Sequence, residues 1–125
     1  MATVRSNIAA GRLFQKRVME KIKEIFGFNQ DQIRTCVGAE CGEDIKFSQD
    51  ARATVGLSIE CKNQKNMNIW SSLEQAKKNC PKGCEEAVVF KRKTLGANKT
   101  YIVVPLDHYL TIRGELKSWE DTYEK

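Results

Sequence analysis

The stretch VGLSIECK, from Val55 to Lys62, alternates apolar and polar residues and decides the predicted fold. Alternation with a period of two is typical of a β-strand, in which residues two apart point to the same face of the sheet. Glu60 and Lys62 close this strand and therefore share one face. A carboxylate and an ammonium group side by side at a strand end are suited to metal-dependent cleavage of phosphodiesters.

Asp44 offers a second carboxylate upstream, where it follows Gly42 and Glu43 and begins another short strand. On a neighbouring strand it would join Glu60, and hard cations such as Mg²⁺ prefer oxygen ligands of this kind. Lys62 would then orient or deprotonate the attacking water, or offset charge that develops on the phosphate. Glu43 is an alternative to Asp44, although alternation points its side chain to the opposite face.

Each of these residues also has a purely structural interpretation. Glu60 and Lys62 can form an exposed salt bridge, and Asp44 can cap the turn after Gly42. The metal-site interpretation is favoured because polar residues stand where an apolar strand would be expected to continue. The one histidine, His108, lies outside these motifs, so no Ser/His/Asp or Cys/His triad can be built from it.

The composition fits one folded domain over residues 1–125, with 41% hydrophobic residues. The 21 lysines and arginines outnumber the 16 aspartates and glutamates, and the net charge of +5 is compatible with a nucleic-acid partner. No apolar stretch reaches the length of a membrane span, and the N-terminus lacks the apolar core of a signal peptide. The sequence therefore predicts a cytoplasmic protein without a membrane partner.

The cysteines number five: Cys36, Cys41, Cys61, Cys80 and Cys84. An odd count in a chain without a secretion signal favours reduced thiols over a disulfide framework. The first two and the last two could be imagined as halves of a zinc site, but their spacings are looser than the two-residue gaps of zinc ribbons. Reduced thiols, some of them buried as small apolar groups, are the preferred interpretation.

A helix is expected over residues 7–26, because apolar residues recur on one face at the helical period. Gly27 follows as the expected stop of this helix. Gln15 falls in the middle of the apolar face, where a polar side chain needs a partner. It is either a core glutamine satisfied by the backbone or a side chain that reaches the active site.

Asn68 is a good N-cap for a second helix over residues 69–79, and Gln75 lies on the polar edge of that helix. The remaining elements are strands at 32–37, 44–47, 55–62, 86–91 and 100–105, a polar loop at 48–54 and a short helical turn at 107–110. The charged tail over 115–125 is expected to be mobile or loosely docked. This αβββαββ order predicts an α/β fold, with a crossover and a mixed central sheet of about five strands flanked by helices.

This order resembles the PD-(D/E)xK nuclease superfamily, which includes restriction endonucleases, phage exonucleases and archaeal Holliday junction resolvases. The match covers about residues 11–105. Asp44 takes the place of the family's first aspartate, and Glu60 and Lys62 match the acidic residue and lysine of its second motif. Gln75 matches a glutamine often found near that active site.

Two runs of sequence make the resemblance more specific, because both are similar to the resolvase branch of the superfamily. The run ECKNQ at 60–64 looks especially like small phage proteins of the resolvase-like type. The run GRLFQ at 11–15 looks like the first-helix motif of the resolvase branch, where a glutamate usually stands at the position of Gln15. The resemblance implies a restriction-endonuclease-like core, and a location in the host cell cytoplasm if the chain is encoded by a phage.

The resemblance also implies an activity, namely Mg²⁺- or Mn²⁺-dependent hydrolysis of DNA with a preference for branched or junction DNA. Asp44, Glu60 and the carbonyl of Cys61 would hold one or two ions, Lys62 would assist, and Gln75 would orient Lys62 or the water. Gln15 would support these groups from the first helix. A four-way junction presents two symmetric scissile strands, so a resolvase is expected to be a homodimer.

Basic residues near the predicted site form the expected DNA contacts. These are Arg12, Arg52, Lys65, Lys91, Arg92, Lys93 and Lys99. Nothing resembles a base-reading helix, so the backbone or the shape of DNA is the expected target. Two alternatives stay open: a restriction-type or exonucleolytic DNase of the same superfamily, and a non-catalytic nucleic-acid-binding module on the same fold.

Overall fold

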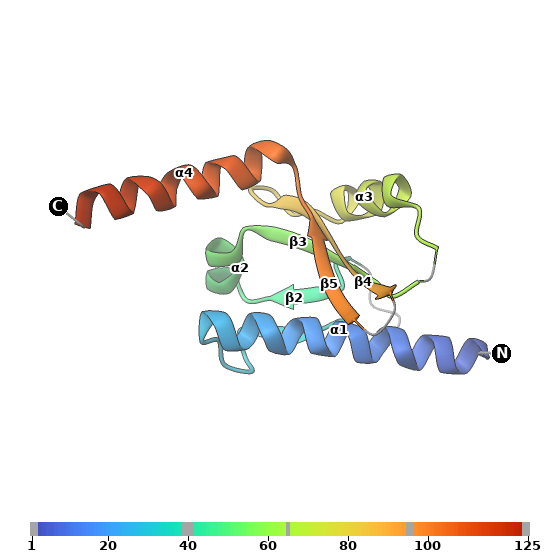
Figure 1. Cartoon of the computed structure of the whole chain (residues 1–125). Coiled ribbons are helices and arrows are strands. Elements are labelled where there is room, and N and C mark those ends of the chain that lie inside the picture. Colours follow the sequence, from blue (N-terminus) through green and yellow to red (C-terminus); the bar gives the residue numbers. More distant parts are fainter. Residues whose placement is uncertain (1–2, 39–41, 65, 95–96, 124–125) are drawn as a thin grey trace.

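The computed structural model describes residues 3–38, 42–64, 66–94 and 97–123, and for residues 92–98 it describes at most the backbone. The helices are α1 (Val4–Phe26), α2 (Gln49–Val55), α3 (Ile69–Lys78) and α4 (Leu106–Tyr123). The strands are β1 (Ile33–Thr35), β2 (Ile45–Phe47), β3 (Leu57–Lys62), β4 (Glu85–Thr94) and β5 (Ala97–Val103). Figure 1 shows α1 and α3 on opposite sides of the strands, with α4 extending away from them.

Strands β3, β4 and β5 form a mixed sheet in that order. β3 pairs with β4 in parallel, and β4 pairs with β5 antiparallel. Because α3 lies between the two parallel strands in sequence, it is the crossover that the strand pattern predicts. This part of the α/β prediction is confirmed.

The prediction of one sheet of about five strands was wrong. β1 and β2 form a separate antiparallel pair of three residues each. Asp44, just before β2, links this pair to β3 because its N–H donates to the carbonyl of Ile59 at 3.1 Å. With strands this short, a single residue makes the link and no ladder forms between β2 and β3.

The core lies between α1 and the sheet. Phe14 and Val18 of α1 pack with Ile59 and Cys61 of β3, together with buried residues of the neighbouring strands. The intervening residues of β3 face α3, where the hydroxyl of Ser58 reaches the carbonyl of Ala76 at 3.5 Å. The alternation of the sequence therefore separates an apolar face toward α1 from a polar face toward α3.

The ends of the two predicted helices follow local signals. Gly27 ends α1 with φ of 70°, a conformation that glycine adopts without a steric penalty. The side chain of Asn68 accepts hydrogen bonds from the N–H groups of Trp70 and Ser71 at 3.1 and 3.2 Å, which confirms it as the N-cap of α3. α1 begins at Val4, three residues earlier than predicted, because Thr3 is its cap.

Two segments are more helical than predicted. The expected loop at 48–54 is mostly α2, which Ser48 caps and of which only Ala51 is fully buried. The expected short turn at 107–110 begins the 18-residue helix α4, which includes most of the expected tail. All residues from 111 to 123 are exposed. A largely exposed helix lacks the strong apolar pattern on which the prediction relied.

Within the described part of the chain, none of the helices is both long enough and apolar enough to cross a bilayer.

Candidate active site at the end of strand β3

Asp44 is held against β3 by two hydrogen bonds. Its N–H donates to Ile59, and its Oδ2 accepts the N–H of Cys61 at 2.7 Å. A bond this short is typical of an N–H donor to a charged carboxylate. The carboxylate of Asp44 is therefore fixed at the end of β3, in the position that the sequence analysis assigned to it.

Glu60 lies beside Asp44 and is 3% exposed. Its Oε1 is 3.8 Å from Nζ of Lys62, while its Oε2 is buried and has no hydrogen-bond partner among the described residues. Burial, and then the negative charge of Asp44, raise the pKa of Glu60 to about 7, against the opposing effect of Lys62. A buried anionic oxygen without a partner is a costly arrangement unless a cation or a proton joins it.

Lys62 and Gln75 meet on the α3 side of the sheet. Nζ of Lys62 donates to Oε1 of Gln75 at 3.2 Å, so strand β3 and helix α3 together orient the ammonium group. The sequence analysis predicted that Gln75 would orient either Lys62 or the water. The structure brings Gln75 to Lys62.

Cys61 turns its side chain toward α1 and its backbone toward Asp44. The thiol is 9% exposed in the core, where burial raises its pKa well above the usual range. In a strand, the N–H and C=O of one residue point to the same edge. Because the N–H of Cys61 points to Asp44, its carbonyl lies on that edge as well, as expected for a third oxygen ligand.

Asn79 belongs to this site, although the sequence analysis did not assign it a role. Its Nδ2 donates to the carbonyl of Gly42 at 3.2 Å, which fixes the approach to Asp44. Its amide also lies close enough to Glu60 to favour the ionised form and lower the pKa. Asn79 is four residues after Gln75, a spacing that places two side chains on one helix face. This spacing from Gln75 is the sequence signal that could have identified Asn79 as a residue of the site.

Glu43 and Arg52 form an ion pair. Nη1 and Nη2 of Arg52 both donate to the carboxylate of Glu43, which is buried. The guanidinium also lies 5.6 Å from the ring centre of Phe47. Glu43 therefore does not replace Asp44. The guanidinium of Arg52, an expected DNA contact, is paired with this carboxylate, and its contact with DNA stays a prediction.

Gln15 is half-buried on α1, next to the core residue Phe14. Among the described residues, no hydrogen bond joins it to Asp44, Glu60 or Lys62. Its supporting role at the predicted site therefore stays a prediction.

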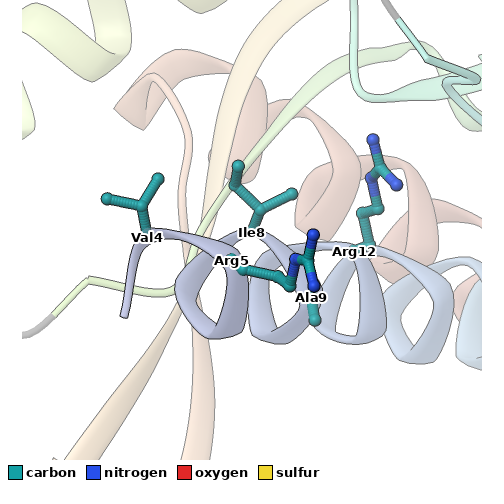
Figure 2. Close-up of a pocket in the computed structure, with 5 residues that line it drawn as sticks. All are labelled: Val4, Arg5, Ile8, Ala9 and Arg12. Carbon is teal, nitrogen blue, oxygen red and sulfur yellow. The ribbon is translucent and has the colours of Figure 1, made fainter. Parts of the chain in front are cut away.

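The structure describes the other expected DNA-contacting residues to different extents. Arg12 is exposed on α1 and shares a shallow pocket with Arg5, seen in Figure 2 with Ala9 between them. This half of α1 meets the end of β3, because the amide of Asn63 donates to the carbonyl of Ala10 at 3.4 Å.

Lys91 is half-buried beside α1, whereas Lys99 is exposed. The backbones of Arg92 and Lys99 are paired across β4 and β5. The side chains of Arg92 and Lys93, and all of Lys65, lie outside the described residues.

The donor set suits a hard divalent cation. Among the residues that the structure describes, no group of three or more His, Cys, Asp and Glu side chains is placed to hold a metal ion. A cation here would be held by the carboxylates of Asp44 and Glu60 and the carbonyl of Cys61. Mg²⁺ keeps several waters and often uses only one or two carboxylates. The unpartnered Oε2 of Glu60 is the observation that fits such an ion.

Comparison of the chain with protein-family models, with curated proteins and with solved structures gave no match.

The raised pKa of Glu60 predicts how the free energy of unfolding of the metal-free protein depends on pH. Below its ordinary pKa of 4.5 the carboxyl is protonated in both states, whereas up to about pH 7 only the folded state keeps the proton. The free energy of unfolding should therefore fall as pH rises through this interval, by roughly 1 to 3 kcal/mol, and then level off. Urea unfolding in EDTA at pH 5 and pH 8 measures the change.

The matched variants for this measurement are Glu60→Gln and Glu85→Gln. Glu60→Gln removes the titrating group and should remove most of the difference between the two pH values. Glu85 is exposed at the start of β4, so its replacement should leave the difference intact. An equal pH dependence in all three proteins would contradict the assigned pKa.

Proposed function

We propose that this protein is a divalent-cation-dependent DNA endonuclease with a preference for branched DNA. The observation that carries the proposal is the buried Oε2 of Glu60, unpartnered beside the fixed carboxylate of Asp44. Lys62 stands next to this pair, where its ammonium group can meet a phosphate. Two carboxylates and a lysine in this arrangement support phosphodiester hydrolysis better than other chemistry.

Each residue of the site has its own role in the proposed reaction. Asp44, Glu60 and the Cys61 carbonyl would hold Mg²⁺ or Mn²⁺, which supplies an activated water and offsets charge on the phosphate. Lys62 donates hydrogen bonds to the water or to a phosphate oxygen, and so stabilises charge that develops as the bond to the leaving oxygen breaks. Gln75 keeps the ammonium group pointed at that position.

Charge favours DNA as the substrate. The chain carries +5 overall, and Arg5 and Arg12 lie on the half of α1 that meets the end of β3. Backbone phosphates are the natural partners of such dispersed arginines, and the affinity should fall steeply with salt. The branched-DNA preference rests on the resemblance of the sequence motifs to resolvase-like nucleases.

The proposal is tested by incubating the full chain with linear duplex, flap and four-way DNA, each with Mg²⁺, Mn²⁺ or EDTA. We expect cleavage with either cation, none in EDTA, and faster cleavage of the four-way substrate than of a duplex of equal length. Cleavage from free ends only, or of duplex alone, would replace the proposal by an exonucleolytic or restriction-type DNase. Salt-dependent binding without cleavage would indicate a non-catalytic module.

A further inference from the structure

Helix α4 carries an apolar seam that nothing in the described chain covers. Its members recur at alternating intervals of three and four residues, the spacing of helices that pack against helices. They are Tyr109, Ile112, Leu116, Trp119 and Tyr123, and they are 40% to 70% exposed. No residue of α4 is buried. In Figure 1 the helix runs outward from the end of β5.

An apolar groove of about 670 Å³ lies beside the start of this helix. Its walls come from the second half of α1 and from the sheet, and they include Ile22, Ile25, Leu57 and Ile102. Arg17, Lys21 and Lys91 also line it. Ile112 belongs both to the groove and to the seam of α4, so the two apolar surfaces are continuous.

The groove contains an unsatisfied polar atom as well. Nε2 of His108 is buried and has no hydrogen-bond partner among the described residues. His108 lines the groove at the beginning of α4. A polar side chain from an occupant of the groove could satisfy this atom, which is rarely left without a partner in a native protein.

Opposite charges distinguish the two surfaces. α1 carries six basic and two acidic residues, a net charge of +4, whereas α4 carries four acidic and two basic residues, a net charge of −2. At the helical period, Glu115 and Glu120 flank the seam on its two sides. Arg17 and Lys21 stand at the groove. An α4 helix in the groove would thus bring acidic flanks to basic walls.

The helix that fills the groove cannot be the chain's own α4. That helix begins at the groove and continues as one helix of 18 residues, about 27 Å long. Leu116, Trp119 and Tyr123 therefore lead away from it. A second copy has no such restriction, and because each copy has both a groove and a helix, a two-fold arrangement satisfies both at once.

We propose that two copies of this chain form a dimer in which the α4 seam of each lies in the apolar groove of the other. The inference rests on α4 and the groove, and it is independent of the nuclease activity. It would also supply the pair of sites that coordinated cutting of a four-way junction needs.

Analytical ultracentrifugation of the full chain tests the dimer. The wild type should sediment as a dimer at micromolar concentration. Leu116→Glu should raise the dimer dissociation constant at least about 30-fold, as loss of a central apolar contact does. Leu110→Glu is the matched control, because Leu110 is 53% exposed on the same helix but lies outside the seam. Circular dichroism should show that both variants remain folded.

A charge exchange tests the groove. Lys21→Glu should weaken the dimer, and adding Glu120→Lys to the same chain should restore part of the affinity. A wild type that stays monomeric at tens of micromolar would overturn the proposal, as would a dimer that Leu116→Glu leaves intact. A third outcome is a dimer that Leu116→Glu breaks and Lys21→Glu leaves unaffected. This outcome would exclude the groove as the docking site of α4, and would indicate that the two α4 helices pair with each other instead.

Discussion

Replacing Glu60 by glutamine is expected to lower the rate of Mg²⁺-dependent DNA cleavage at least about 10³-fold, or about 4 kcal/mol of transition-state stabilisation. Glutamine keeps the shape of the side chain but removes the charge that would hold the cation. Asp44→Asn should have a similar effect, because the amide oxygen can still accept the N–H of Cys61 while the negative charge is lost. Single-turnover cleavage of labelled four-way DNA measures both rates.

A folding defect cannot account for such a loss in Glu60→Gln. Glu60 is a buried carboxylate beside another carboxylate, so its neutralisation should stabilise the metal-free fold at pH 8. Loss of activity together with gained stability is expected of a functional residue. Glu85→Gln makes the same chemical change at an exposed position and should cleave at the wild-type rate. Full activity in Glu60→Gln would end the nuclease proposal.

Lys62→Ala is expected to lower the cleavage rate by about 10²- to 10³-fold while leaving Mg²⁺ affinity nearly unchanged. The reason is that, in the proposed mechanism, its ammonium group would offset charge in the transition state, whereas oxygen atoms would hold the cation. Removing one electrostatic donor from an active site typically has an effect of this size. Cleavage at saturating Mg²⁺, with a separate titration of Mg²⁺ binding by calorimetry, distinguishes the two quantities.

Gln75→Ala should give a smaller loss, of roughly ten-fold, and should add little to Lys62→Ala. Gln75 acts by accepting a hydrogen bond from Lys62, so its contribution disappears with that side chain. Lys78→Ala is the matched control, since Lys78 is exposed on the same helix. Strictly additive losses in the double variant would show that Gln75 works independently of Lys62.

The candidate site followed from local patterns to a large extent. Alternation along β3 placed Glu60 and Lys62 on one face, and the N-cap at Asn68 placed α3 so that Gln75 could reach Lys62. These patterns are readable because strand and helix periods act over neighbouring residues. The contact between Asp44 and Cys61 was expected only as proximity, and its hydrogen bond became known from the fold.

The errors arose where exposure or long-range pairing decides the structure. α2 and α4 bury little, so their helical periods carry little apolar signal. The ion pair of Arg52 with Glu43 was not foreseen either, because Glu43 lies nine residues earlier, in the segment before β2, and nothing in the sequence links the two. The separation of β1 and β2 from the main sheet depends on strand length, and the ends of elements are poorly specified by local sequence.

By itself, the sequence determined the elements with strong periods, the faces of β3, and the candidate residues of the site. The tertiary structure alone decided the rest: the burial of Glu60 that raises its pKa, the pairing of Arg52 with Glu43, and the groove beside α4. The physical reason is that periodicity is a property of consecutive residues. Desolvation, ion pairing and cavities depend instead on groups that the folded chain brings together from distant positions.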